Sequence, residues 1–188
     1  MATIAPTAPP KESLECLITD TIFHQQMERN PVDSQCPLRV YAIRGYYKRT
    51  MGNPLTNDIN IYDDAIFVSF EYKGIKHFSS YNANTDPSVA RLHVGTLQPG
   101  VWSFQHHLLH GKTPSFGQSK PVTLKRFGQG LDTGMFGICI HCGGRRATGS
   151  LGCLTIWPPQ WQAFFNTVSS FMRNAALSSF PLFLKENM

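Results

Sequence analysis

The 188-residue sequence carries little charge and has no long run of apolar residues. Charged residues make up 15% of the chain and hydrophobic residues 41%, which is enough apolar material for a core and excludes wholesale disorder. The longest uncharged segment, residues 147–172, contains two prolines and several amides and hydroxyls, so a membrane-spanning helix is not expected. No internal period of about 20–50 residues occurs, which excludes a solenoid of repeats.

The N-terminal residues lack the positively charged start and apolar run of a secretory signal. The five cysteines are an odd number, which favours reduced thiols over a disulfide framework. Lys and Arg outnumber Asp and Glu by 17 to 12, and the positive residues are scattered along the chain. This excess favours an anionic partner but does not distinguish nucleic acid, cell wall and membrane surface.

The chain is expected to form a flexible arm over residues 1–12 and a single domain over residues 13–188. Apolar residues at helical spacing predict a helix over residues 13–29, ended by an Asn-Pro pair. From residue 38 onward, short runs rich in Val, Ile, Phe, Tyr and Trp alternate with clusters of turn-forming residues. This spacing is typical of antiparallel sheets and small barrels, since no helical crossover for parallel strands is apparent between residues 40 and 140.

A second helix is predicted after the paired prolines Pro158 and Pro159, which are favoured at helix starts. Its opposite face has amides and serines but no Lys or Arg, which favours core packing over a membrane interface. The expected fold is therefore mainly β (α+β), with an antiparallel β-sandwich or barrel-like core and flanking N- and C-terminal helices. The apolar face of this helix consists of Trp161, Phe164, Phe165, Val168, Phe171 and Met172.

Residues 132–157 contain the residue types that nucleophilic acyl transfer needs. His141 ends a strand-like run, and Cys153 follows after a glycine-containing loop. An extended residue covers roughly 3.3 Å, so this loop is long enough to bring the two side chains together. A cysteine attacks acyl groups as a thiolate, and a neighbouring imidazole that takes its proton supplies that form. Backbone N–H groups near Gly152 and Cys153 are candidates for binding the oxyanion.

The pattern Ile-His-(Cys)-Gly followed by Ser-x-Gly-Cys-Leu-x-Ile resembles the catalytic segment of the L,D-transpeptidase catalytic-domain family. The resemblance implies a β-rich cysteine enzyme that forms or exchanges peptide bonds in peptidoglycan. It further implies Cys153 as nucleophile, His141 as its base, Gly152 as the glycine before the nucleophile and Ser150 as the residue that opens the motif. Ser150 is therefore counted among the substrate-binding candidates. A wider likeness, over most of residues 40–170, is to small phage-type proteins that lyse the bacterial wall.

The sequence departs from the family pattern near the proposed nucleophile. Leu151 stands where the family has histidine, and Thr155 stands where the family often has an arginine thought to hold a substrate carboxylate. The segment between the histidine and the cysteine is also short for the family. Arg145 and Arg146, in this segment, are candidates for the missing carboxylate contact because guanidinium groups bind carboxylates bidentately. His110 is a further candidate for lining a substrate groove.

Metal chemistry is the main alternative at these residues. Cys139 and Cys142 form a Cys-x-x-Cys pair, but a structural zinc site needs four ligands and no second pair exists. Asp132 with the histidines near residue 110 would give a zinc peptidase, although no His-Glu-x-x-His motif occurs. Asp132 is also a candidate for orienting His141, with a backbone carbonyl as the competing group. The histidines of this alternative are His106, His107 and His110.

Other polar residues are assigned ordinary structural roles. Asp63, Asp64 and the Asn-Ala-Asn-Thr-Asp segment over residues 82–86 are interpreted as turn and capping residues. Cys153 itself has the alternative role of a small buried packing residue, which is the usual fate of a free cysteine.

Together these observations predict a cysteine-dependent acyl-transfer enzyme of peptidoglycan stem peptides, an endolysin-type peptidase or an L,D-transpeptidase-like enzyme, that needs no cofactor. Neither nucleic acid binding nor stable membrane insertion is expected. With no visible export signal, the protein is expected to be made in the cytoplasm and to act on the wall in the periplasm after release. The alternatives are a zinc-dependent peptidoglycan peptidase and a non-catalytic wall-binding or virion protein.

Overall fold

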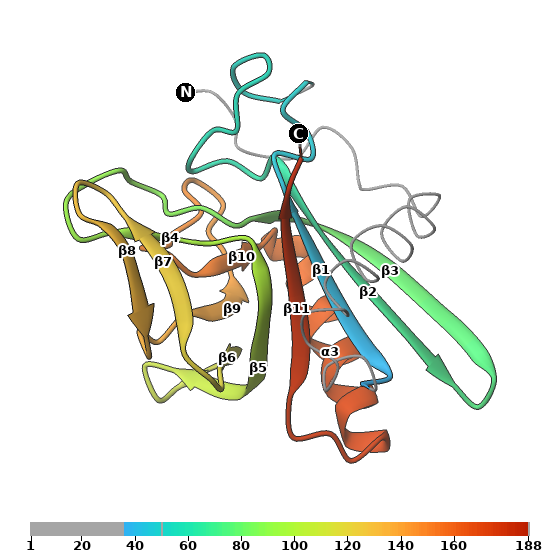
Figure 1. Cartoon of the computed structure of the whole chain (residues 1–188). Coiled ribbons are helices and arrows are strands. Elements are labelled where there is room, and N and C mark those ends of the chain that lie inside the picture. The colour runs from blue at the N-terminus through green and yellow to red at the C-terminus, as the bar shows by residue number, and fades with distance from the viewer. Residues whose placement is uncertain (1–35, 50, 188) are drawn as a thin grey trace.

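The computed structural model describes residues 36–49 and 51–187, and eight of their strands close into a barrel (Figure 1). The order around the barrel is β1-β11-β5-β6-β9-β10-β3-β2, and β4-β7-β8 form a separate three-stranded sheet. The barrel strands are β1 (Leu38–Arg44), β2 (Asp64–Tyr72), β3 (Ile75–Asn84), β5 (Gly100–Leu109), β6 (Thr113–Gln118), β9 (Cys139–Cys142), β10 (Leu154–Ile156) and β11 (Phe180–Glu186). The small sheet consists of β4 (Gly95–Leu97), β7 (Val122–Arg126) and β8 (Gly130–Gly134).

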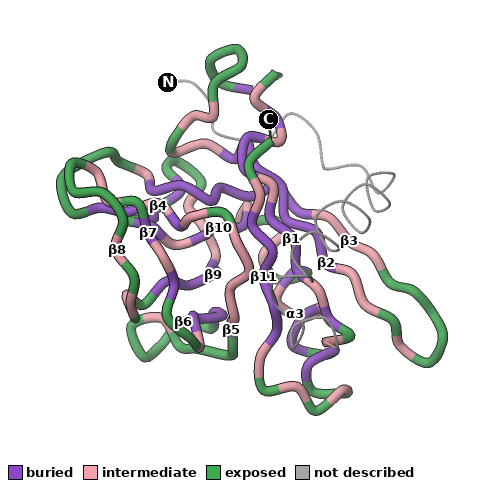
Figure 2. The backbone as a smooth tube through the Cα atoms, viewed as in Figure 1, coloured by how far each residue is buried: buried purple, intermediate pink, exposed green. Residues whose placement is uncertain are grey.

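The helix α3 (Pro158–Asn174) packs its apolar face into the barrel core. Phe164 and Val168 are fully buried, and the Phe164 ring meets the rings of Tyr81 on β3 and Phe116 on β6 edge-on. The polar face carries Gln162, which remains exposed. Figure 2 shows that buried backbone is concentrated where β1, β2 and β11 lie beside α3, whereas the tip of the β2–β3 hairpin is exposed.

The strands β1, β2 and β11 are apolar on both faces, because each face is covered. Their inward side chains join the main core with those of α3. Tyr41, Ala65, Phe67 and Phe183 form a second cluster on the other face. This double burial explains why these strands have near-continuous apolar sequences rather than strict alternation.

The predicted mainly β fold with a barrel-like core is confirmed, but its flanking helices are not. The helix predicted over residues 13–29 lies outside the described residues. The aromatic pattern after the paired prolines does form α3, yet α3 is not a C-terminal flank, because β11 follows it and closes the barrel between β1 and β5. The sheet is also not wholly antiparallel: β11 pairs in parallel with β1, and β10 pairs in parallel with β9.

The parallel pair β9–β10 positions the chemistry-bearing residues. The register places Leu154 beside Ile140 and Thr155 beside His141. Ile140 and Leu154 belong to the barrel core, so the alternate residues, including Cys139 and His141, face outward. The connection between the two strands is the segment 143–153, which contains the loop and turn described below.

Among the described residues, no helix has the length and hydrophobicity needed to cross a membrane.

Replacing Phe164 with alanine is expected to lower the free energy of unfolding by about 3–5 kcal/mol, because it opens a cavity where α3 meets the barrel. The matched control Gln162→Ala, on the exposed face of the same helix, is expected to change stability by no more than about 0.5 kcal/mol. Urea unfolding followed by circular dichroism measures both. Equal effects of the two substitutions would contradict the packing role of this face.

Candidate active site

The thiol of Cys153 lies against β9, immediately before β10 begins. The backbone N–H of Cys139 donates a hydrogen bond to Cys153 Sγ at 3.3 Å, and Cys153 Sγ is 3.9 Å from the carbonyl oxygen of Gly137. Cys153 is partly exposed. The sulfur is therefore held in place by strand backbone while remaining within reach of solvent.

The imidazole of His141 lies on the same outer face as Cys139 and is 8% exposed. Its Nδ1 is 2.8 Å from the carbonyl oxygen of Cys142. A carbonyl only accepts hydrogen bonds, so we assign the proton of the neutral ring to Nδ1, which leaves Nε2 unprotonated. The Cys142 carbonyl thus has the orienting role considered for Asp132, whose carboxylate instead accepts a 2.6 Å hydrogen bond from Arg126.

The electrostatics of the site favour a thiolate at Cys153. Hydrogen bonding from the Cys139 side chain and from His141 lowers the pKa of Cys153 to about 5, even though burial opposes the charged form. Burial by itself lowers the pKa of His141, but its interactions with Cys153 outweigh this and raise that pKa above the ordinary value of 6.5. The pair is therefore poised as thiolate and imidazolium, the reactive form of a cysteine nucleophile.

Ser150 fixes the turn that presents Cys153. Its buried hydroxyl accepts a 3.0 Å hydrogen bond from the Gly152 N–H and donates a 2.5 Å hydrogen bond to the Cys153 carbonyl. Its backbone is joined to Ser88, on the segment that follows β3, by two hydrogen bonds of 2.7 Å. Ser150 was predicted to bind substrate, and the structure places it inside the turn, where it positions Cys153.

Gly152 is required by the close packing of the turn. Its φ of +135° is a conformation that side chains rarely adopt, and a Cβ there would be only 2.7 Å from the carbonyl oxygen of Gly95. The Gly152 N–H is already bonded to the Ser150 hydroxyl, which leaves the N–H of Cys153 as the other candidate donor that the sequence predicted for the oxyanion. Leu151, at the tip of the turn, is 59% exposed.

The loop between His141 and the turn is fastened at both ends, and its middle projects into solvent. Tyr62 donates a 2.8 Å hydrogen bond from its hydroxyl to the Gly144 carbonyl, and Asn60 accepts a 2.9 Å hydrogen bond from the Thr148 N–H. Arg145 and Arg146 are exposed between these two points. Arg145 is close enough to Cys142 to act on the pKa of its thiol. The two predicted carboxylate-binding residues are thus free to reach a ligand.

Thr155 does not take the place of the arginine that the resembling family has at its position. Thr155 is fully buried. Its Cβ packs against Gly143, because a Cβ added to that glycine would be 3.1 Å from it and would also collide with the Tyr62 hydroxyl. Thr155 is therefore not placed to contact a ligand from β10.

His110 lies away from the thiol. Gly117 is the residue of β6 that pairs with Cys139, whereas His110 occupies the turn beyond Thr113, at least four residues along the strand. At roughly 3.3 Å per residue, this separation exceeds about 13 Å. His107 on β5 lies closer to the site than His110 does. Its Cβ and ring atoms lie against Gly117, within 3.3 Å of the position that a Cβ on that glycine would occupy.

The predicted alternative of a metal site gains no support in the described part of the chain, where no group of three His, Cys, Asp or Glu side chains could hold a metal ion. The His106 ring lies tilted against Phe116 and edge-on to Phe165. The Asp132 carboxylate instead forms a salt bridge with Arg126.

A buried network of charged and polar residues supports the segments around the turn, and no motif in the sequence pointed to it. Asp64 accepts hydrogen bonds from the Gly45 N–H and from the N–H and hydroxyl of Thr85. Arg44, 4% exposed, bridges Asp86 at 3.2 Å and donates to the Thr85 carbonyl. The network joins the end of β1 to the segment that carries Ser88. Residues interpreted as simple turn formers therefore help to anchor the turn that contains Cys153.

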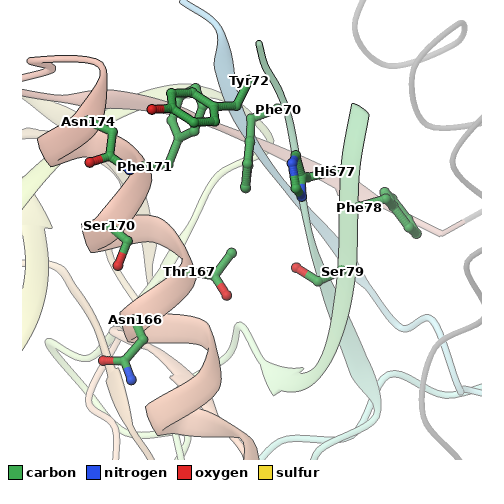
Figure 3. Close-up of a pocket in the computed structure, with 10 residues that line it drawn as sticks. All are labelled: Phe70, Tyr72, His77, Phe78, Ser79, Asn166, Thr167, Ser170, Phe171 and Asn174. Carbon is green, nitrogen blue, oxygen red and sulfur yellow. The ribbon is translucent and has the colours of Figure 1, made fainter. Parts of the chain in front are cut away.

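A separate groove of about 510 Å³ lies between α3 and the β2–β3 hairpin. Figure 3 shows its two walls, with Thr167, Ser170 and Asn166 on the helix and His77 and Ser79 on β3. No residue of the candidate active site lines it. The groove is therefore not part of the proposed chemistry.

Comparisons of this chain with models of protein families, with curated proteins and with solved structures find no match.

Alkylation by iodoacetamide is expected to report the thiolate of Cys153. The labelling rate should be half-maximal near pH 5 and level above it, because only the thiolate reacts. Cys142, whose pKa is raised by burial, should label only at alkaline pH and serves as the internal control. In His141→Ala the midpoint for Cys153 should move upward. Peptide mass spectrometry gives the rates, and a Cys153 midpoint near the ordinary value of 9.0 would contradict the assignment.

Stability is expected to fall as pH rises from about 4 to about 8, because the fold favours protonated carboxyl groups. Burial and the neighbouring Asp64 raise the pKa of Asp63 to about 8, and burial and Asp86 raise that of Asp64 to about 7, both from 3.8. The native state therefore binds more protons than the unfolded state in this range, and their loss destabilises it.

Asp63→Asn should reduce this decline and raise the melting temperature at alkaline pH by several degrees. The control Asp64→Asn exchanges one of the two oxygens that accept hydrogen bonds from Gly45 and Thr85 for an NH2 donor. At least one of these bonds is then lost, so the melting temperature should fall at every pH. Differential scanning calorimetry at several pH values measures both, and an unchanged pH dependence in Asp63→Asn would refute the role of that carboxyl group.

Proposed function

We propose that this protein is a cysteine-dependent acyl-transfer enzyme that acts on the peptides of bacterial peptidoglycan. The observation that carries the proposal is the contact set of one sulfur. Cys153 Sγ accepts a hydrogen bond from the Cys139 N–H, and Cys139 and His141 together lower the pKa of its thiol. The turn that carries Cys153 is fixed by Ser150. A cysteine that served only packing would need none of these contacts.

In the proposed reaction the Cys153 thiolate attacks an amide carbonyl of the substrate. The developing oxyanion is bound by the N–H of Cys153, since the N–H of Gly152 is engaged by Ser150. The His141 imidazolium, held by the Cys142 carbonyl, donates its Nε2 proton to the departing amine. The neutral imidazole then takes a proton from a water molecule or a second amine as this nucleophile attacks the thioester carbonyl. The carbon–sulfur bond breaks, the Cys153 thiolate is regenerated, and the acyl group is released by hydrolysis or by exchange.

The substrate class rests on the resemblance of the His141–Ile156 segment to L,D-transpeptidase catalytic domains and on the charge around the site. Peptidoglycan stem peptides carry free carboxylates, and Arg145 and Arg146 project from the loop that leads to the nucleophile. Bidentate guanidinium contacts would select such a carboxylate and orient the scissile bond. Action on the wall would follow release of the protein into the periplasm.

Muropeptide analysis tests this proposal directly. Purified sacculi incubated with the wild type should give a changed muropeptide profile by mass spectrometry, and Cys153→Ala should leave the profile as in buffer. Cys36→Ala, a control thiol outside the site, should act as the wild type does. A chelator should have no effect.

Two results would decide against the proposal. Equal product patterns from the wild type and Cys153→Ala would exclude the cysteine mechanism, and loss of these products with a chelator would favour the zinc peptidase. Binding of both proteins to sacculi with no new muropeptide would instead identify a non-catalytic wall-binding protein.

A further inference from the structure

Cys139 is a second thiol at the site, and the acyl-transfer mechanism does not use its reactivity. Its side chain is 1% exposed, and its sulfur lies 3.3 Å from the Gly137 carbonyl oxygen. Cys153 Sγ lies 3.9 Å from the same oxygen. Both sulfurs therefore lie near the same carbonyl oxygen, and each thiol affects the pKa of the other.

The backbone at this position matches the geometry of a disulfide. The β9–β10 register pairs Leu154 with Ile140, so one step back along both chains Cys153 stands opposite Cys139. Neighbouring strands lie about 4.7–4.9 Å apart, within the Cα separation of about 4.4–6.8 Å that disulfides span. Cys153 Sγ already contacts the Cys139 backbone at 3.3 Å, which shows that its side chain points toward the other cysteine.

The two thiols differ in access in the way that a reversible oxidation requires. Cys153 is partly exposed and has the hydrogen bonds that stabilise a thiolate, so an oxidant meets this sulfur first. Cys139 is shielded from solvent, so an oxidant in solution does not reach it directly. It can react only with its neighbour, which is the property of a resolving cysteine.

We propose that Cys139 and Cys153 form a reversible disulfide under peroxide, which switches the nucleophile off and protects it from irreversible oxidation. This effect on activity rests on the proposed function, whereas formation of the bond does not. In the first step the Cys153 thiolate attacks one oxygen of hydrogen peroxide, forming a sulfenic acid and releasing hydroxide. In the second step the Cys139 sulfur attacks the Cys153 sulfur, the S–S bond forms, and the sulfenic oxygen leaves with protons as water.

The other nearby thiol provides a matched control. Cys142 belongs to the same strand but lies on the opposite face from Cys139, and its sulfur is 3.5 Å from the Gly143 carbonyl. Its pKa is raised, so it offers little thiolate at neutral pH. A non-specific oxidation would not distinguish Cys142 from Cys139, whereas the proposed bond requires Cys139 alone.

The experiment treats the full-length reduced protein with hydrogen peroxide, blocks the remaining thiols by alkylation and maps the digested protein by mass spectrometry. The wild type should lose two hydrogen atoms in mass and yield one linked pair of peptides, containing Cys139 and Cys153, which dithiothreitol separates. Cys142→Ser should give the same linkage. Cys139→Ser should instead accumulate sulfinic acid at Cys153, which dithiothreitol does not reverse.

Sulfinic acid at Cys153 of the wild type, or a linkage of Cys153 to Cys142 or to a second chain, would overturn the inference. The wild-type map decides this even if Cys139→Ser does not fold. The map needs no enzymatic activity, so its outcome is independent of the muropeptide assay. If the linkage forms in a protein that leaves muropeptides unchanged, the proposed function fails and the disulfide stands.

Discussion

The candidate site depends on one structural constraint, the parallel pairing of β9 with β10. This pairing aligns residues that are far apart along the chain, so that Cys153 meets the backbone of Cys139 and lies near His141. Because side chains alternate between the faces of a strand, the same register sends Ile140 and Leu154 into the barrel core. Core packing therefore holds Cys153 and His141 in place indirectly, because a slip of one residue would move apolar side chains out of the core and Cys153 away from the histidine.

Around this pair the turn of Cys153 is closely hydrogen-bonded, whereas the loop that precedes the turn is exposed. The turn of the nucleophile is tied to Ser88 through Ser150, and the segment of Ser88 is anchored by the buried network of Arg44, Asp64 and Asp86. The arginines of the intervening loop remain exposed. This division suits covalent catalysis, in which the nucleophile and its base need fixed geometry and the substrate needs access.

Local sequence patterns predicted much of the fold, because they reflect burial. The β-rich runs from residue 38 onward and the apolar face of α3 both appear in the structure. The role of β11 was missed, since its Phe-Pro-Leu-Phe-Leu run is short and follows a helix, and nothing local shows that it pairs with β1 at the other end of the described chain. The parallel pairing of β9 was missed for the same reason: a loop, not a helix, makes the crossover.

For the site, the sequence alone supplied the residue types and their order: a histidine at a strand end, a glycine-containing loop and a cysteine after glycine. Alternation along a strand is a local property, so the sequence also implies that Cys139 and His141 share a strand face. Only the tertiary structure decided that the Cys142 carbonyl orients the imidazole, that Ser150 braces the turn, that His110 is distant, and that a second thiol adjoins the first. Each of these depends on which backbone segments lie side by side, and that is set by closure of the barrel and burial of its core.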